Sequence, residues 1–385
     1  MKVLNQGQIK QLEKATLTQE AKQFIAQFPK LKANTSLIFE GELAPNSKSA
    51  CLVEVTTNSI LYAKNENEKM SPASMTKVMS MLLVMEALDS GKIKLDDMVV
   101  ATEDACRLGG SQIYLEVNEK MSVEDLIKSM AIASANDATM ALALYVAGNE
   151  ESFVSMMNQR ARELGMDNTN YVNPYGFDDP NHYTSSKDMA TLSCYLINNY
   201  PKILEYTSRY EDYVREDSEK RFWLVNTNKL VKFVDGVDGL KTGWTNNAGY
   251  CLTSTIKREG KRYLAVSMNC ESPELRNKDI VSMLTFAINN YDVIKYKTKG
   301  EVVEEINDYK FRPSVYHLVL EEDINIVIKK SVNKNNITSS IENGKFKFFV
   351  DDVLYKEYDL SVKEEVKKKS FFEMILMILK EIIFN

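Results

Sequence analysis

The sequence has few of the residues that metal hydrolases and disulfide-bonded proteins need. Only two histidines occur among its 385 residues, His182 and His317, and there is no H-E-x-x-H segment. A catalytic zinc ion takes three protein ligands, often from such a segment, so the sequence argues against a zinc hydrolase. The five cysteines are odd in number and far apart, which indicates neither a disulfide framework nor a zinc ribbon. We expect them to be small buried apolar residues.

Two further absences concern partners and location. The formal net charge is -6, and positive and negative residues are mixed along most of the chain, so we expect no nucleic-acid partner. Residues 1–35 contain no apolar segment of the kind found in a secretory signal peptide. Within them, Glu20 to Phe28 is expected to form a short amphipathic helix. If the protein works outside the cytoplasm, its export signal is not visible here.

The middle of the chain predicts a mixed helix-and-sheet domain. Residues 48–55 and 60–63 have the pattern of two strands, and a helix is expected from Pro72 to about Ser90, with Ser71 as its N-cap. This helix is apolar nearly all round and should therefore be buried. Helices are also expected from Ser122 to about residue 133, over residues 137–147 and over residues 274–291. A hairpin is expected over residues 250–268, and alternating β segments from about residue 299 to residue 362.

The C-terminal segment changes in character. Lys367-Lys-Lys369 precedes 16 residues that are mostly Phe, Met, Ile and Leu. As a helix they would span roughly 24 Å, less than the roughly 30 Å hydrocarbon core of a bilayer. We interpret this segment as an amphipathic helix in a membrane interface, with the lysines near lipid phosphates. The alternative is a terminal helix that packs on the protein's own core.

Ser74-Met-Thr-Lys77 is an S-x-x-K pattern near the start of the helix predicted from Pro72. Residues three apart share a helix face, so the Lys77 amine would lie beside the Ser74 hydroxyl. Burial lowers the pKa of a lysine, and the neutral amine can then take the hydroxyl proton. The first helical turn also offers free N–H groups to an oxyanion. Similar patterns at Ser254 and Ser331 lie in strand or turn segments, where the two side chains point to opposite faces.

Ser134-Ala-Asn136 is an S-x-N pattern between two predicted helices. Alone, such a tripeptide is more often a turn in which the asparagine caps a helix. In an active site, the Ser134 hydroxyl would relay a proton to a leaving amine, and the Asn136 amide would orient Lys77 or the substrate.

Lys241-Thr-Gly243 is the only K-T-G segment in the chain and is expected to begin a strand. Lys241 and Thr242 on a strand edge can bind a carboxylate, and Gly243 lets backbone approach a ligand closely. The alternative is a solvated lysine in a turn.

Together, the three patterns in this order are far more specific than any one of them. They resemble the three motifs of penicillin-binding proteins and serine β-lactamases. Further segments resemble the low-molecular-mass D-alanyl-D-alanine carboxypeptidases, and the resemblance covers about residues 46–296. These segments are residues 71–77, 134–138, 173–177, 185–190, 226–230 and 237–243, with Ala248-Gly249.

The resemblance implies a catalytic role for the first two motifs. Ser74 would be the acylated nucleophile and Lys77 its base. Ser134 and Asn136 would form the second edge of the site.

The third motif would bind substrate. Lys241 and Thr242 would hold the terminal D-Ala carboxylate, beside Gly243. The oxyanion hole would use the backbone N–H groups of Ser74 and of Trp244.

Three positions depart from the family pattern. Ala135 replaces a frequent glycine, Tyr175 replaces a common histidine, and Trp244 occupies a variable position. None of these three residues touches a reacting atom, so the departures concern the shape of the pocket. His182 is expected to be structural.

The resemblance implies an α/β (α+β) fold: a three-layer domain on an antiparallel sheet, then a small all-β domain and an amphipathic C-terminal helix. The expected domains are an N-terminal extension over residues 1–45, the carboxypeptidase domain over 46–296, the β domain over 297–366 and a membrane anchor over 367–385.

The expected activity is that of a serine-type D-Ala-D-Ala carboxypeptidase without metal or cofactor. It would remove the terminal D-Ala from peptidoglycan stem peptides through a Ser74 acyl-enzyme, at the extracytoplasmic face of a bacterial membrane. β-Lactam antibiotics would inhibit it by binding covalently. The alternatives are a serine β-lactamase and a catalytically silent member that only binds peptidoglycan or β-lactams. A class A β-lactamase carries an E-x-x-L-N segment, and residues 137–239 contain none.

Overall fold

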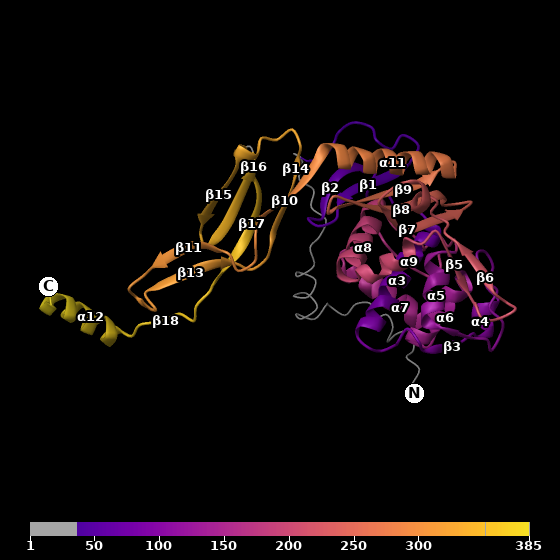
Figure 1. Cartoon of the computed structure of the whole chain (residues 1–385), viewed down its shortest axis with the longest axis horizontal. Coiled ribbons are helices and arrows are strands. Elements are labelled where there is room, and N and C mark those ends of the chain that lie inside the picture. The colour runs from indigo at the N-terminus through magenta and orange to yellow at the C-terminus, as the bar shows by residue number, and fades with distance from the viewer. Residues whose placement is uncertain (1–36, 351, 385) are drawn as a thin grey trace. The chain divides into compact units, whose positions relative to one another are not determined.

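The computed structural model describes residues 37–350 and 352–384. The chain forms two compact units, Met1–Asn289 and Asn290–Asn385, which are shown in Figure 1. The short helix expected from Glu20 to Phe28 lies outside the described residues.

The first unit is built on a five-stranded antiparallel sheet in the order β2-β1-β9-β8-β7. Helix α11 lies on one face of the sheet, and α3 and α8 lie on the other (Figure 1). This is the expected three-layer arrangement. Strand β7 is at the edge of the sheet, which leaves its outer side open to a ligand strand. The bounds are β1 (Ser49–Glu54), β2 (Ser59–Lys64), β7 (Val237–Thr245), β8 (Gly249–Arg258), β9 (Lys261–Cys270) and α11 (Pro273–Asn290).

The helical layer contains the predicted buried helix, but its start differs from the prediction. A 3-10 turn, η1 (Ala73–Thr76), precedes α3 (Lys77–Asp89). Ser71 is not an N-cap, because its hydroxyl donates to the carboxylate of Asp178 instead. Two long helices were not predicted. The other helices of this layer are α4 (Glu103–Cys106), α5 (Val123–Ala131), α6 (Asn136–Ala147), α7 (Glu150–Glu163), α8 (Ser186–Asn199), η2 (Pro201–Ile203), α9 (Leu204–Thr207) and α10 (Leu230–Phe233).

Side-chain caps fix the start of several of these helices. The Ser122 hydroxyl accepts the N–H of Asp125 at the start of α5, as the sequence predicts. Asn149 and Ser185 cap α7 and α8 in the same way. Two short hairpins complete the unit: β3 (Met98–Val100) with β4 (Lys120–Ser122), and β5 (Glu211–Val214) with β6 (Phe222–Val225).

The second unit is an all-β region, as expected, and ends in a helix. Its first strand is β10 (Tyr291–Lys297), which pairs with β14 (Ile324–Lys329), so the unit begins at Asn290. A small apolar core includes Leu320, Ile326 and Phe348. The remaining elements are β11 (Val302–Asn307), β12 (Phe311–Arg312), β13 (Val315–Leu320), η3 (Lys334–Asn336), β15 (Ile337–Glu342), β16 (Lys345–Val350), β17 (Val353–Val362) and β18 (Lys367–Lys368).

The chain closes with helix α12 (Phe371–Phe384). Phe371 and Phe372 at its start are both 74% exposed, and Leu376 is also exposed. Among the described residues, no helix combines the length and apolar character needed to cross a membrane.

Candidate active site

Ser74 lies in a turn whose backbone is held against two glycines. Residue Ala73 before it has a left-handed φ of +48°, which costs about 1 kcal/mol or more and persists only when the surroundings enforce it. A Cβ on Gly243 would lie 2.5 Å from the Pro72 carbonyl oxygen, and one on Gly176 would lie 1.9 Å from the Ala73 carbonyl oxygen. Both positions therefore require glycine, because backbone packs directly on backbone there.

Lys77 is fully buried, and its amine reaches three acceptors. Nζ lies 2.9 Å from Ser74 Oγ, 2.7 Å from Asn136 Oδ1 and 2.8 Å from the Tyr175 carbonyl oxygen. Burial holds the pKa of Lys77 well below its usual value, and the positive charge of Lys241 lowers it further. A lysine in this state can lose its proton and then accept one from the adjacent hydroxyl.

The segment Asn173-Pro-Tyr-Gly-Phe177 forms the floor beneath this lysine. The Asn173 side-chain oxygen accepts the N–H groups of Tyr175, Gly176 and Phe177, and its amide donates to the Phe177 carbonyl. This arrangement fixes the turn and aims the Tyr175 carbonyl at Lys77. The sequence singled out the segment only through its resemblance, and its local function is to present a backbone acceptor.

Ser134 and Asn136 lie at the turn between α5 and α6. The Asn136 oxygen accepts from Lys77, and its nitrogen donates to the Gly109 carbonyl at 2.7 Å, so both ends of the amide are fixed. Ser134 is buried and has a left-handed φ of +62°. Within the described part of the chain, its hydroxyl has no hydrogen-bond partner, which leaves it available to a ligand.

The third motif lies within edge strand β7 rather than at its start. Lys241 is buried, and burial lowers its pKa to about 7, with a further contribution from the positive charge of Arg276. The Thr242 hydroxyl donates to the Thr227 hydroxyl at 2.7 Å. Gly243 is the glycine that packs on the Ser74 turn. The three motifs therefore surround one region at the open edge of the sheet.

Two residues in this region, Arg276 and Thr227, were not assigned a role from the sequence. Arg276 on α11 is buried and adds a second positive charge near Lys241. A buried arginine needs a reason, but its spacing from the K-T-G segment carries no pattern that a single sequence could reveal. Thr227 lies in one of the segments that supported the resemblance.

Trp244, expected beside the oxyanion hole, is 54% exposed and packs against Tyr250 on the neighbouring strand. The other S-x-x-K patterns do not join the site. The Ser254 hydroxyl is buried and donates to the Gly239 carbonyl, and Ser331 lies in the second unit.

His182 has the structural position that the sequence suggested. Its Nδ1 accepts the N–H of Val172 at 3.1 Å, so Nε2 carries the proton and donates to the Thr76 hydroxyl at 2.8 Å. Burial lowers its pKa to about 4. The neutral His182 ring therefore connects Thr76, in the Ser74 turn, with the backbone at Val172. No group of three or more His, Cys, Asp or Glu residues in the described segments is placed to hold a metal ion.

Comparison with known proteins gives a consistent result. The model of the Peptidase_S11 family, D-alanyl-D-alanine carboxypeptidase, matches residues 39–272. D-alanyl-D-alanine carboxypeptidase DacF of Bacillus subtilis is 42% identical over 348 residues, which cover 87% of this chain and 89% of that protein. DacC of Escherichia coli, also a D-alanyl-D-alanine carboxypeptidase, is 33% identical over 65% of this chain and 63% of its own length.

Solved structures show the same relationship. Penicillin-binding protein 5 of Haemophilus influenzae matches with a TM-score of 0.80 and 28% identity, over 86% of this chain and all of that one. Penicillin-binding protein D2 of Listeria monocytogenes, in its ampicillin-bound form, matches with a TM-score of 0.58 and 32% identity, over 64% of this chain and all of that one.

Proposed function

Because the chain belongs to the D-alanyl-D-alanine carboxypeptidase family of serine peptidases, we propose that it hydrolyses the terminal D-Ala-D-Ala bond of peptidoglycan stem pentapeptides through Ser74. The observation that carries this proposal is the 2.9 Å contact between Lys77 Nζ and Ser74 Oγ, in a site that lowers the pKa of the lysine. Nucleophile and base are thus already in contact.

In the first half of the reaction, neutral Lys77 takes the proton of Ser74 while Oγ attacks the carbonyl carbon of the penultimate D-Ala. The backbone N–H groups of Ser74 and Trp244 stabilise the oxyanion. The peptide bond then breaks, and the amine of the leaving D-Ala receives a proton through the Ser134 hydroxyl, which is replenished from Lys77. The free Ser134 hydroxyl supports this relay. Water hydrolyses the ester and restores Ser74.

The carboxylate of the terminal D-Ala binds to the β7 edge. Lys241, Thr242 and the buried Arg276 supply positive charge and a hydroxyl there. An unpaired buried cation is costly, and a carboxylate offsets that cost. Binding should therefore raise the pKa of Lys241 and take up protons near neutral pH.

Covalent binding of β-lactams is part of the proposal. Two solved structures of penicillin-binding protein D2 from Listeria monocytogenes contain bound ampicillin and bound cefotaxime. In a β-lactam adduct the leaving nitrogen stays attached to the acyl group, whereas D-Ala diffuses away. With no E-x-x-L-N glutamate to activate water, the adduct should persist, which favours the carboxypeptidase over a β-lactamase.

Location and domain roles also remain proposals. Peptidases of this family act on peptidoglycan, outside the cytoplasm. We assign residues 46–289 to catalysis, 290–366 to an accessory β domain and 367–385 to a peripheral anchor on the extracytoplasmic face of the membrane. The boundary expected after residue 296 moves to Asn289, because β10 pairs with β14 of the second unit. The exposed Phe371 and Phe372 after the Lys367–Lys369 cluster support the anchor.

The nucleophile is tested with fluorescent penicillin. Ser74→Ala should abolish labelling and D-Ala release from diacetyl-Lys-D-Ala-D-Ala, while Ser254→Ala, the matched control in β8, retains both. Labelling of the Ser74 variant would refute the assignment. A penicillin adduct on the wild-type protein that lasts minutes or longer would support the carboxypeptidase. Fast hydrolysis of nitrocefin without a detectable adduct would favour a β-lactamase.

The anchor is tested by truncation. A chain that ends at Val366 should still bind penicillin but no longer sediment with anionic vesicles. If the full-length protein does not sediment with the vesicles either, α12 is not an anchor.

A further inference from the structure

The loop between α4 and β4 supports Asn136 from behind. The Gly109 carbonyl accepts from the Asn136 side-chain nitrogen, and the Ser111 carbonyl accepts from the Asn136 backbone N–H, both at 2.7 Å. Asn136 in turn contacts the amine of Lys77. The position of this loop therefore decides how the amide meets the general base.

Asp137 anchors the same loop from the inside. Its carboxylate is fully buried and accepts the N–H groups of Ile113 at 3.2 Å, Leu115 at 3.0 Å and Ala138 at 2.9 Å. Within the described residues it has no ion pair, and its burial is compensated by these backbone N–H groups and by its place in the first turn of α6.

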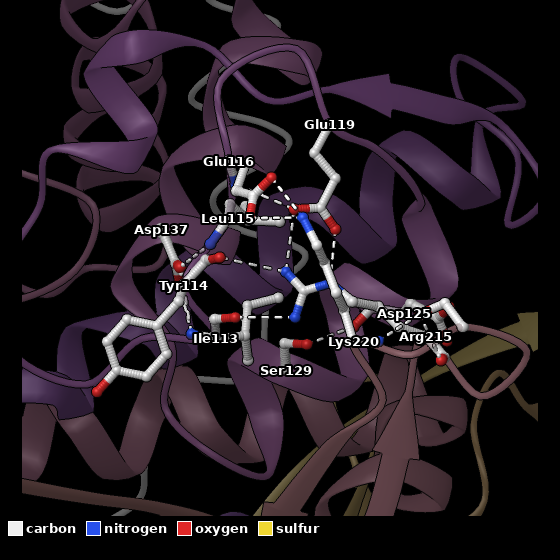
Figure 2. Close-up of polar contacts among 11 residues, drawn as sticks. Ile113, Tyr114, Leu115, Glu116, Glu119, Asp125, Ser129, Asp137, Arg215 and Lys220 are labelled. Carbon is white, nitrogen blue, oxygen red and sulfur yellow. Dashed lines mark hydrogen bonds and ion pairs between the residues drawn. The ribbon is translucent and has the colours of Figure 1, made fainter.

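Arg215 anchors the loop from the outside. Its guanidinium pairs with Glu119 at 2.6 Å and donates to the Ile113 carbonyl at 2.9 Å and the Tyr114 carbonyl at 3.4 Å. Figure 2 shows Asp137 and Arg215 reaching residues 113–115 from different sides. The two charged side chains thus hold one short segment, but only Asp137 belongs to the helix that carries Asn136.

We propose that Asp137 is a positioning residue for catalysis, which fixes the loop that orients Asn136 and places a negative charge near the amine of Lys77. The proposal rests on the proposed roles of Ser74 and Lys77. It explains why a carboxylate, rather than a neutral acceptor, occupies this buried position.

The charges around Lys77 define what Asp137 contributes. Burial and the positive charge of Lys241 on β7 lower the pKa of Lys77, whereas the negative charge of Asp137 on α6 raises it. Burial raises the pKa of the Cys106 thiol on α4, and the negative charge of Asp137 contributes to that shift. Without Asp137, the neutral form of Lys77 would persist to lower pH, and the amine would be a weaker base.

The test is the pH dependence of the second-order rate constant for acylation by benzylpenicillin, measured for wild type, Asp137→Asn and Arg215→Gln. Both variants loosen the loop, so each should lower the plateau rate by about tenfold or more. Only Asp137→Asn removes the charge near Lys77. Its acidic limb should therefore move to lower pH, while that of Arg215→Gln stays at the wild-type position.

Two outcomes would overturn the proposal. An acidic limb of Asp137→Asn at the wild-type pH would show that the charge does not act on the base. An equal limb shift in Arg215→Gln would assign the effect to loop mobility. Because acylation is covalent, the final adduct stoichiometry gives the folded fraction of each variant. If Asp137→Asn does not fold, Asp137→Ser, whose hydroxyl accepts one N–H, replaces it with the same expected shift.

The proposed function and the role of Asp137 can be refuted independently of each other. Wild-type protein that forms no adduct on Ser74 would refute the proposed function. A wild-type adduct with unshifted variant profiles would refute the role of Asp137 alone.

Discussion

The two units of the chain use charge in opposite ways. The first unit buries Lys77, Asp137, Lys241 and Arg276 at or beside the site. The second unit keeps its charged pairs at the surface, as in Lys347 with Glu342, and encloses a small core of aliphatic and aromatic residues. Buried charge lowers stability unless it is compensated, so its concentration in one unit indicates that the first unit gives up stability for chemistry.

The largest effect is expected from removing the buried charge of Lys241, which should lower activity and raise stability. Lys241→Met should lower kcat/KM for D-Ala release by about a thousandfold or more, because the carboxylate loses its partner. The same change should stabilise the first unit at pH 7 by about 4 kcal/mol, because the pKa of the buried lysine is about 7 in the fold and about 10.5 when unfolded. Denaturant unfolding and peptide kinetics measure the two effects.

The stability gained by Lys241→Met should depend on pH, because the pKa of Lys241 is lower in the folded than in the unfolded chain. The unfolded lysine keeps its proton up to about pH 10.5, whereas the folded one loses it near pH 7. Wild-type stability therefore rises between these pH values, and the advantage of Lys241→Met shrinks. A constant advantage up to pH 10.5 would contradict the charge explanation.

Next in size is a steric comparison between the units. Gly243→Ala would place a Cβ 2.5 Å from the Pro72 carbonyl, so it should destabilise by about 3–4 kcal/mol and slow penicillin acylation. Gly300→Ala in the second unit meets no atom within 4 Å and carries only the cost of its φ of +79°, about 1 kcal/mol. Equal losses in thermal unfolding would mean that the contact with the Ser74 turn is not tight.

His182 should make the stability of the first unit depend on pH below neutrality. Its pKa is about 4 in the fold, against about 6.5 when unfolded, so the unfolded state binds the proton first as pH falls. The contribution is fully present above pH 6.5 and decreases by about 3 kcal/mol towards pH 4. His182→Gln should lack this slope in denaturant titrations at several pH values, and a slope that persists in the variant would assign it to other groups.

The smallest expected effect concerns the surface pair of the second unit. Glu342→Gln should leave the thermal midpoint within error, because exposed ion pairs are screened by water. Glu86→Gln, which breaks a partly buried pair with Arg160, should lower the midpoint of the first unit by several degrees. A larger loss from Glu342→Gln would reverse the contrast between the units.

Much of the fold could be predicted from local pattern. The apolar helix after Ser74, the Ser122 cap and the hairpin after residue 249 agree with the structure within a few residues, because their periodicity and caps are local. Helices α7 and α8 were not predicted, although each begins with a capping side chain, Asn149 or Ser185. The 3-10 turn at Ala73 also escaped prediction, since packing against Gly243 and Gly176 enforces its left-handed φ.

By itself, the sequence determined which residue types are present and in what order: a serine three residues before a lysine, a serine-asparagine turn, and a single K-T-G segment. These local patterns sufficed to indicate the family, since spacing within a helix or turn follows from backbone geometry. Only the tertiary structure decided that the Tyr175 carbonyl meets Lys77, that Arg276 lies near Lys241, and that Asp137 is buried behind the base. The physical reason is that burial and charge proximity depend on segments far apart in the chain, and these two quantities set the pKa of a catalytic group.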